Sequence, residues 1–376
     1  MSHQSYINMT RRSNVHKYWA QPGLAMLPAT EILRESLTLS HAITTFSLFA
    51  RRSREARSHP ELQTINQIGA GLQGTIFEQV GKSLVMKKEN IGNESLASNL
   101  QNECQIHRAV LAAFDRFGVS VNINGNFHVP QLYEFISKTD NDEFWSDTLS
   151  KFPQDYRTRT DMVKMERILP LTTATRRALV AHFHPQLDET NVENILAEPE
   201  NKHCLVRIYL GQDNSVVPQG QGQLRNFPLS LKSMKELRLD VGAFAAAMGK
   251  AFAIMQWGAG VDGDDVEFVL GTSSIEEPDF PEMQHRAIGI YLLDFGQCRQ
   301  IDLSGDVDDV YQAFKGAMVT GDNRLFIPKD PAVYSEFRSA YVKAAQLILE
   351  QKGLSDIFNA EDFMTEYEDY VADLLL

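Results

Sequence analysis

Three glycines close together form the first pattern in this chain that can support chemistry. Gly69, Gly71 and Gly74 make a G-x-G-x-x-G sequence, and the residues that follow, Thr75 to Val80, favour a strand. The glycines are therefore expected in a β-hairpin, and not at the start of a helix as in a dinucleotide-binding turn. Glycines let backbone amides approach an anion closely, so the hairpin is a candidate phosphate-binding loop. A tight turn without a ligand is the alternative interpretation.

A lysine and a glutamate further along the chain are expected to pair. Lys87 ends the strand-like run that starts at Ser83, and Glu103 lies on an amphipathic helix expected over Leu96–Phe114. Side chains alternate along a strand, so Lys88 should point to the opposite face from Lys87. A buried ammonium needs a carboxylate partner, which Glu103 can supply. Two unrelated surface charges are the alternative.

A third pattern follows an apolar strand expected over Ile288–Leu293. Asp294, Phe295 and Gly296 read as D-F-G, whose aspartate holds magnesium on the phosphates in protein kinases. Met165 to Pro170, which includes Glu166, ends a strand where a kinase hinge would fall. The glycine loop, the lysine strand, the helix glutamate and D-F-G occur in kinase order, so the chain from about residue 62 resembles the protein-kinase-like superfamily.

The segment before the D-F-G strand departs from that pattern. If Asp265 takes the metal-binding asparagine position, the catalytic aspartate position falls on Gly260 and the histidine position on Gly258. An acidic cluster stands there instead, and its mutual repulsion calls for a cation, either Mg²⁺ held together with Asp294 or a guanidinium. A solvated acidic turn is the alternative. The cluster comprises Asp262, Asp264, Asp265 and Glu267.

Three stretches are similar to a fungal protein family long left uncharacterised. They are Met165 to Leu171, Asp265 to Gly271 and Leu293 to Cys298. Members of this family include the arginine-containing cyclodipeptide synthases, which join arginyl-tRNA and a second aminoacyl-tRNA into a cyclo-Arg-Xaa diketopiperazine. The resemblance implies that no cofactor is required. Mg²⁺ is optional, and ATP enters only if the chain is a kinase-like phosphotransferase.

The resemblance assigns roles to the residues named above. Asp262, Asp265, Glu267 and Asp294 are the catalytic candidates, and Asp264, Lys87, Glu103 and Glu166 are the substrate-binding candidates. Arg51, Arg52, Arg54 and Arg57 are the candidate tRNA contacts, with a looser basic group between Arg157 and Arg177. Solvated surface is the alternative for both basic groups. A covalent aminoacyl-enzyme would need a nucleophile, for which Cys104 and Cys298 are candidates, with His107 and His128 as bases.

The elements that must position these residues predict an α+β protein with two lobes. A β-rich, kinase-like N-lobe is expected over residues 61–170 and a helical C-lobe over 171–376, preceded by an N-terminal helical extension and basic linker over 1–60. Within that extension a helix is expected over Ala29–Ala50, and the clearest C-lobe helix over Leu237–Met255.

Composition limits the function classes. The 376 residues carry three cysteines without a C-x-x-C pair, which argues against a disulfide framework or a zinc site and fits a reducing, cytoplasmic compartment. The sequence has no apolar run of eighteen or more residues, so no membrane span is expected, and the N-terminal residues lack an apolar core, so no secretory signal is expected. The net charge of -13 argues against nonspecific nucleic-acid coating, so no DNA is expected, and it is the main objection to tRNA binding. A small-molecule phosphotransferase and an inactive pseudokinase binding module remain the alternative functions.

Overall fold

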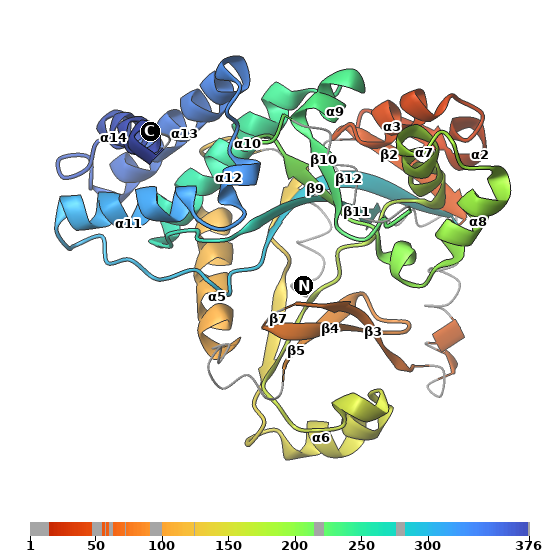
Figure 1. Cartoon of the computed structure of the whole chain (residues 1–376). Coiled ribbons are helices and arrows are strands. Elements are labelled where there is room, and N and C mark those ends of the chain that lie inside the picture. Colours follow the sequence, from red (N-terminus) through yellow and green to blue (C-terminus); the bar gives the residue numbers. More distant parts are fainter. Residues whose placement is uncertain are drawn as a thin grey trace.

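The computed structural model describes residues 15–46, 55–56, 58–59, 63–71, 73–90, 100–123, 125–213, 222–275 and 283–374. It combines two β-sheets with many helices, which confirms the α+β class (Figure 1). A smaller sheet occupies one end of the molecule, and most of the helices gather with the larger sheet at the other end (Figure 1). No helix within the described ranges is long and apolar enough to cross a membrane.

Five described strands form the smaller sheet, all paired antiparallel in the order β3-β4-β5-β8-β7. Period-2 alternation sends their side chains to two small cores: Met86 and Met162 pack on one face with Trp145, while Val163 packs on the other. This sheet therefore places neighbouring side chains of one strand in different environments. Its strands are β3 (Ile65–Ala70), β4 (Gly74–Gln79), β5 (Leu84–Glu89), β7 (Leu132–Ile136) and β8 (Met162–Glu166).

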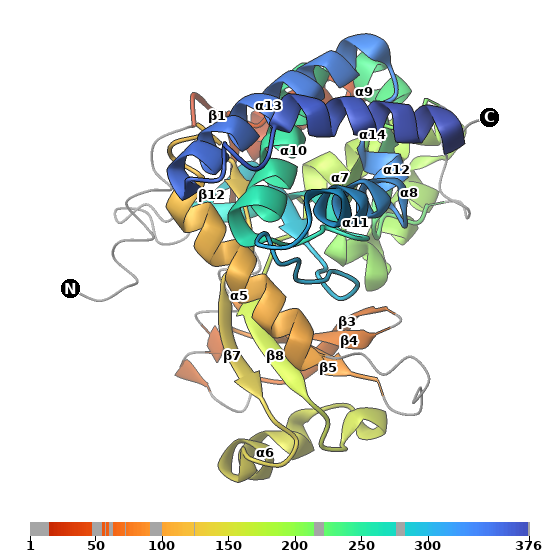
Figure 2. The same cartoon turned by 90° about the vertical axis from the view of Figure 1, so that its left-hand side faces the viewer.

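Helix α5 (Leu100–Phe117) connects the smaller sheet with the helical part of the molecule. It lies alongside β7 and β8 at one end and packs at the other against the turn η6 (Ile254–Ala259) that follows α10 (Val241–Ala253) (Figure 2). Its first turn carries Glu103, so the helix presents this carboxylate to the sheet. On the other face of the sheet lie the helical segments α6 (Asp142–Thr148), η3 (Leu149–Lys151) and η4 (Gln154–Tyr156).

Seven described strands form the larger sheet, in the order β1-β2-β12-β11-β9-β10, with β6 also paired to β12. The long hairpin β11–β12 is its centre and ends immediately before Asp294. The sheet therefore pairs an N-terminal segment with strands from the second half of the chain. Its strands are β1 (Lys17–Ala20), β2 (His41–Phe46), β6 (Phe127–His128), β9 (Val206–Tyr209), β10 (Phe227–Ser230), β11 (Glu267–Ile275) and β12 (Met283–Leu293).

The N-terminal segment differs from the helix expected over Ala29–Ala50. Helix α3 (Ala29–Ser36) begins as predicted, but β2 follows it, so the prediction is wrong for the later described residues. β-branched residues such as Ile43 and Thr44 fit a strand, and β2 pairs with β1 and β12. A partner some 240 positions away thus overrides the helical periodicity of this segment. Leu33 and Ile43 join the main core.

Helices cover the rest of the main core. Trp257, fully buried, stands among the rings of Phe314, Phe363 and Tyr311 and donates from Nε1 to the Tyr341 hydroxyl at 2.8 Å. These contacts join several helices into one body. The helices are α2 (Gln21–Leu24), α7 (Thr173–Phe183), α8 (Glu189–Ala197), η5 (Glu200–His203), α9 (Leu231–Glu236), α10, the π-helical turn η6 (Ile254–Ala259), α11 (Val307–Val319), α12 (Asn323–Phe326), α13 (Pro331–Lys352) and α14 (Ala360–Leu374).

Candidate functional site

The predicted contact between Lys87 and Glu103 is present, and Asp294 joins it. The Lys87 ammonium lies 2.7 and 2.8 Å from the two carboxylate oxygens of Glu103, and 3.2 Å from Oδ1 of Asp294. Burial would lower the pKa of Lys87, but the two carboxylates raise it above its usual value. Burial also raises the pKa of Glu103, against the effect of Lys87. Contacts from one ammonium to both oxygens fit a charged pair, so we take both groups as ionised.

Strand alternation explains why Lys87 faces this site. Lys88, one position later, points to the opposite face, where its ammonium donates to the Thr158 carbonyl at 2.6 Å and to the Thr160 hydroxyl at 2.8 Å. Its side chain is 1% exposed and lies near the ring of Trp145. Burial lowers the pKa of Lys88 to about 8. The sheet thus separates one lysine for the site from one lysine for the core.

The glycine hairpin reaches the D-F-G segment. Gly69 and Gly74 lie on β3 and β4, and Gly71 lies between them. A Cβ on Gly74 would stand 2.9 Å from the Lys88 carbonyl oxygen, so close strand approach requires glycine there. The Gln73 side chain lies directly against Gly296, where a Cβ would overlap it. The hairpin therefore contacts the D-F-G segment at Gly296.

Gly260, where a kinase pattern would have its catalytic aspartate, cannot readily accept a side chain. It ends η6 in the left-handed conformation, with φ 68° and ψ 35°. A Cβ there would lie 2.8 Å from the Ile301 carbonyl oxygen and 2.9 Å from Nε2 of Gln300. The carbonyl of Gly260 also accepts from the Ile301 amide at 2.6 Å. Backbone conformation and close packing both favour glycine at this position.

The acidic cluster divides into parts that face different ways. Asp262 is fully buried, and its carboxylate accepts from the backbone amides of Arg299 and Asp264, at 2.9 and 3.2 Å, and from the Arg299 guanidinium at 3.2 Å. Asp264 accepts from the Thr320 hydroxyl at 2.5 Å. Asp262 therefore holds its loop against the segment after D-F-G and has a structural role.

The outer part of the cluster gathers around Asp294. Asp265, half-buried with φ 54°, accepts from the Asp322 amide at 2.9 Å. Burial raises the pKa of Asp265, and the carboxylates of Asp322 and Asp294 raise it further. Glycine is required at Gly321, because a Cβ there would overlap the Asp265 carboxylate. This part of the cluster concentrates negative charge beside the Lys87 group.

Arg207 is a site residue that the sequence patterns did not reveal. It lies on β9, and its guanidinium contacts Glu267 and, at 3.1 Å, Oδ2 of Asp322. Burial raises the pKa of Glu267 to about 7, and neighbouring carboxylates add to this while Arg207 opposes it. Burial would lower the pKa of Arg207, but Glu267 and the other neighbours raise it, so the guanidinium stays charged. An arginine within an apolar strand was the one signal that could have drawn attention to it.

The other predicted substrate-binding residue, Glu166, and the candidate nucleophiles and bases have structural or buried positions. Glu166 accepts from the Gln131 amide at 3.1 Å and so braces the connection between β7 and β8. Burial raises the pKa of both Cys104 and Cys298, which keeps them as thiols. Burial lowers the pKa of His107 to about 4, and its Nε2 donates to the Pro130 carbonyl at 2.8 Å. These groups are poorly suited to act as nucleophiles or bases in the present geometry. His128 packs against Tyr291.

The structure describes only the second of the two basic groups predicted as tRNA contacts. Arg51, Arg52, Arg54 and Arg57 lie outside the described residues. In the second group, Arg159, Lys164, Arg167 and Arg177 each pair with a carboxylate. Much of the charge in the second group is thus neutralised within the chain.

Among the described residues, no group of three or more His, Cys, Asp or Glu side chains is arranged to hold a metal ion. Neither a protein-family model nor a curated protein sequence matches the chain. The function is therefore argued from the geometry of the site and from the resemblance described above.

Proposed function

We propose that this chain is an aminoacyl-tRNA-dependent cyclodipeptide synthase that forms a cyclo-Arg-Xaa diketopiperazine. The observation that carries the proposal is the carboxylate group around Asp294, which already holds one guanidinium, that of Arg207, through Glu267 and Asp322. Asp265, adjacent to Asp322, has no arginine partner among the described residues. A carboxylate surplus of this kind suits the guanidinium or the α-ammonium group of an arginyl substrate.

The smaller sheet and its helix support a two-lobed, protein-kinase-like fold as the scaffold. Three antiparallel strands with a glycine hairpin precede α5, and Lys87 on the third strand pairs with Glu103 on that helix. Asp294 follows β12 and contacts the same lysine. This is the order and pairing of the kinase landmarks.

The lack of room at Gly260 fits a reaction without phosphoryl transfer. In an aminoacyl-tRNA the ester is already activated, so the α-amine of one residue attacks the ester carbonyl of the other. A C–N bond forms, the C–O bond to the tRNA ribose breaks, and the amine proton passes to a base. A second attack of the same kind closes the ring. Positioning and proton transfer are sufficient for both steps.

Asp265 and Glu267 are the best-placed proton acceptors of the predicted catalytic group. Burial brings the pKa of Glu267 to about 7, close to the pH at which a general base works best. Asp294 would help to orient the substrate ammonium together with Asp264, whereas Asp262 would support the loop. Mg²⁺ is not needed for this chemistry, and the Lys87 ammonium, held in place by Glu103, would contact the ester or the tRNA end.

A nucleotide-binding protein is the second candidate, favoured by the Lys87–Glu103–Asp294 contacts and the hairpin that contacts Gly296. As a phosphotransferase it would use ATP and Mg²⁺, but Gly260 offers no space for the usual base. As a pseudokinase it would bind nucleotide without chemistry. A thermal-shift titration with ATP and Mg²⁺ distinguishes a nucleotide-binding protein from the synthase, because a strong ATP-dependent rise in Tm would count against the synthase.

The decisive experiment is expression of the chain in a bacterial host, whose cytoplasm supplies aminoacyl-tRNAs, followed by mass spectrometry of the medium. The synthase should release an arginine-containing diketopiperazine. Asp265→Ala and Glu267→Ala should abolish the product, while the change of exposed Glu236 to alanine on α9 should not. Absence of product from a soluble, well-expressed chain would refute the proposal.

The arginines outside the described residues allow a test of the RNA partner. Changing Arg51, Arg52 and Arg54 together to alanine should weaken tRNA binding and flatten its salt dependence. Binding is measured with purified arginyl-tRNA at several salt concentrations. An unchanged affinity would place the RNA on another surface.

A further inference from the structure

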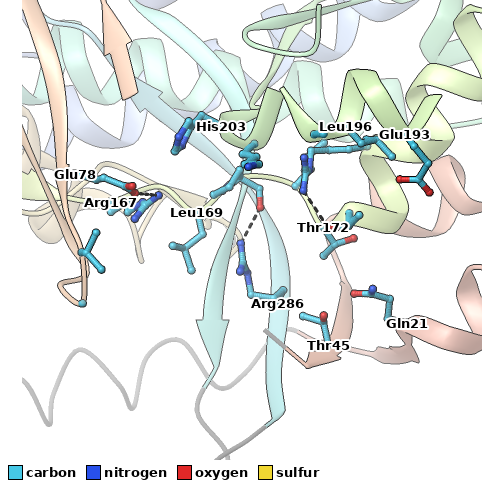
Figure 3. Close-up of a pocket in the computed structure, with 18 residues that line it drawn as sticks. Gln21, Thr45, Glu78, Arg167, Leu169, Thr172, Glu193, Leu196, His203 and Arg286 are labelled. Atoms are coloured by element: carbon cyan, nitrogen blue, oxygen red, sulfur yellow. Dashed lines mark hydrogen bonds and ion pairs between the residues drawn. The ribbon is translucent and has the colours of Figure 1, made fainter. Parts of the chain in front are cut away.

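A cavity lies apart from the residues around Asp294. It has a volume of about 500 Å³ and is bounded by β4, the segment after β8, the start of α7, η5 and β12. None of the candidate catalytic residues lines it. Figure 3 shows Arg167 directed at Glu78, and Arg286 on its strand pointing toward the segment that carries Leu169.

The walls of this cavity carry more positive than negative charge. Arg167, Arg176, Lys202 and Arg286 line it, against Glu78 and Glu193. Arg167 is paired with Glu78, and Glu193 is engaged by Arg177, a residue outside the lining. Arg176, Lys202 and Arg286 are left without a carboxylate partner among the residues that the structure describes. In a chain of net charge -13, such a local excess is unusual.

Two of these cations are deeply buried and held by neutral groups. Arg286, 7% exposed, donates from Nε and Nη2 to the Thr272 hydroxyl and from Nη2 to the Pro170 carbonyl at 2.7 Å. Arg176, 9% exposed, donates to the Asn201 carbonyl and the Thr173 hydroxyl, each at 3.1 Å. The Nε of Arg176 is buried without a hydrogen-bond partner. A buried guanidinium without a counter-ion is costly, so an anion in this cavity would stabilise both.

The pKa directions of the lining residues and the start of α7 also favour an anion in this cavity. Burial, together with the charges of Arg167 and Arg176, lowers the pKa of Arg286 to about 10. Burial also lowers the pKa of His203, which keeps this lining residue neutral. Helix α7 begins at Thr173 on the cavity wall with Thr172 as its N-cap, and the partial positive charge of a helix N-terminus favours an anion.

We propose that this cavity binds a small, multiply charged phosphate compound through Arg176, Lys202 and Arg286. Three cations without carboxylate partners match two or more negative charges better than one, and arginine and lysine are the usual phosphate partners. The volume admits more than a single phosphate group. His203 has the only aromatic ring among the described lining residues, so the ligand is expected to lack a stacked base. This inference is independent of the proposed synthase activity.

Titration calorimetry of the full chain with inorganic pyrophosphate tests the proposal. At constant ionic strength, pyrophosphate should bind saturably and raise Tm, whereas the same ionic strength of chloride should not. Lys202 is exposed, so Lys202→Gln should leave the fold intact and weaken pyrophosphate binding about tenfold. Lys232→Gln on α9, where Lys232 faces Glu236 at 3.9 Å, is the matched control and should keep the wild-type affinity.

One further variant and one further ligand complete the test. Arg176→Gln should abolish binding, and if it does not fold, Lys202→Gln still decides the outcome. No saturable pyrophosphate binding, or equal affinities for Lys202→Gln and the wild type, would overturn the proposal. Binding of uncharged tRNA that Lys202→Gln weakens, without any binding of pyrophosphate, would also overturn it, because the ligand would then be an RNA backbone.

Discussion

The structure predicts that placing an aspartate at Gly260 damages the fold and creates no phosphotransferase. Gly353 is an unusually close control. Both glycines end a helix in the left-handed conformation, with φ 68° and ψ 35° at Gly260 and φ 68° and ψ 31° at Gly353. They differ in their surroundings, because a Cβ on Gly353 would meet nothing within 4 Å.

The magnitude follows from two contributions. A residue other than glycine in the left-handed conformation costs about 1 kcal/mol, and both variants bear this cost. An Asp at a helix C-terminus adds a small unfavourable dipole effect, also shared. Only Gly260→Asp must displace the Ile301 carbonyl oxygen, 2.8 Å from the new Cβ, and overpacking of this kind costs about 1–3 kcal/mol. We expect a loss of about 1 kcal/mol for Gly353→Asp and about 2–4 kcal/mol for Gly260→Asp.

Denaturant unfolding monitored by tryptophan fluorescence measures both losses. Trp257 precedes Gly260 by three positions and is fully buried, so its emission reports on this region. Equal destabilisation by the two substitutions would refute the steric argument. A stable Gly260→Asp protein that transfers phosphate from ATP would refute it more strongly, and would favour the phosphotransferase alternative.

Three further predictions concern buried charges, each measured as the free energy of unfolding in denaturant. Lys87→Met should cost about 3 kcal/mol because Glu103 loses its partner, and adding Glu103→Gln should recover part of it; no recovery would contradict the pair. The pKa of Lys88 is about 8 when folded, below its unfolded value of 10.5, so the unfolded chain binds more protons between these values and stability should rise with pH there. Lys88→Met should remove up to about 1 kcal/mol per pH unit of that rise, and an unchanged slope would count against it. Arg207→Met should cost about 1 kcal/mol more at pH 8 than at pH 5, because Glu267, whose pKa is about 7, pairs with Arg207 as a carboxylate only above that value; equal losses at both pH values would show that Glu267 does not titrate in this range.

Local sequence patterns were sufficient for much of the smaller sheet and its site. Alternation along β5 correctly separated Lys87 from Lys88, and helical periodicity located α5 with Glu103 in its first turn. The strand before Asp294 was also recognised. These features depend on periods of two or 3.6 residues within one segment, which the order of residues reveals directly.

Contacts between distant segments could not be read in the same way. β2 was expected as helix because its residues fit either structure, and its pairing with β12 made it a strand. Arg207, Glu267 and Asp322 meet from three separate elements, and Asp262 turns inward because Arg299 lies behind it. The cations that line the cavity, Arg176, Lys202 and Arg286, likewise come from separate elements.

The chain order thus determined which chemical groups are available and on which face of their own strand or helix they stand. The fold decided which of them face one another, how deeply they are buried and which carboxylates remain for a ligand. The physical reason is that burial and charge neutralisation depend on whatever the rest of the chain brings close, and the cost of an unpaired buried charge is set by those neighbours.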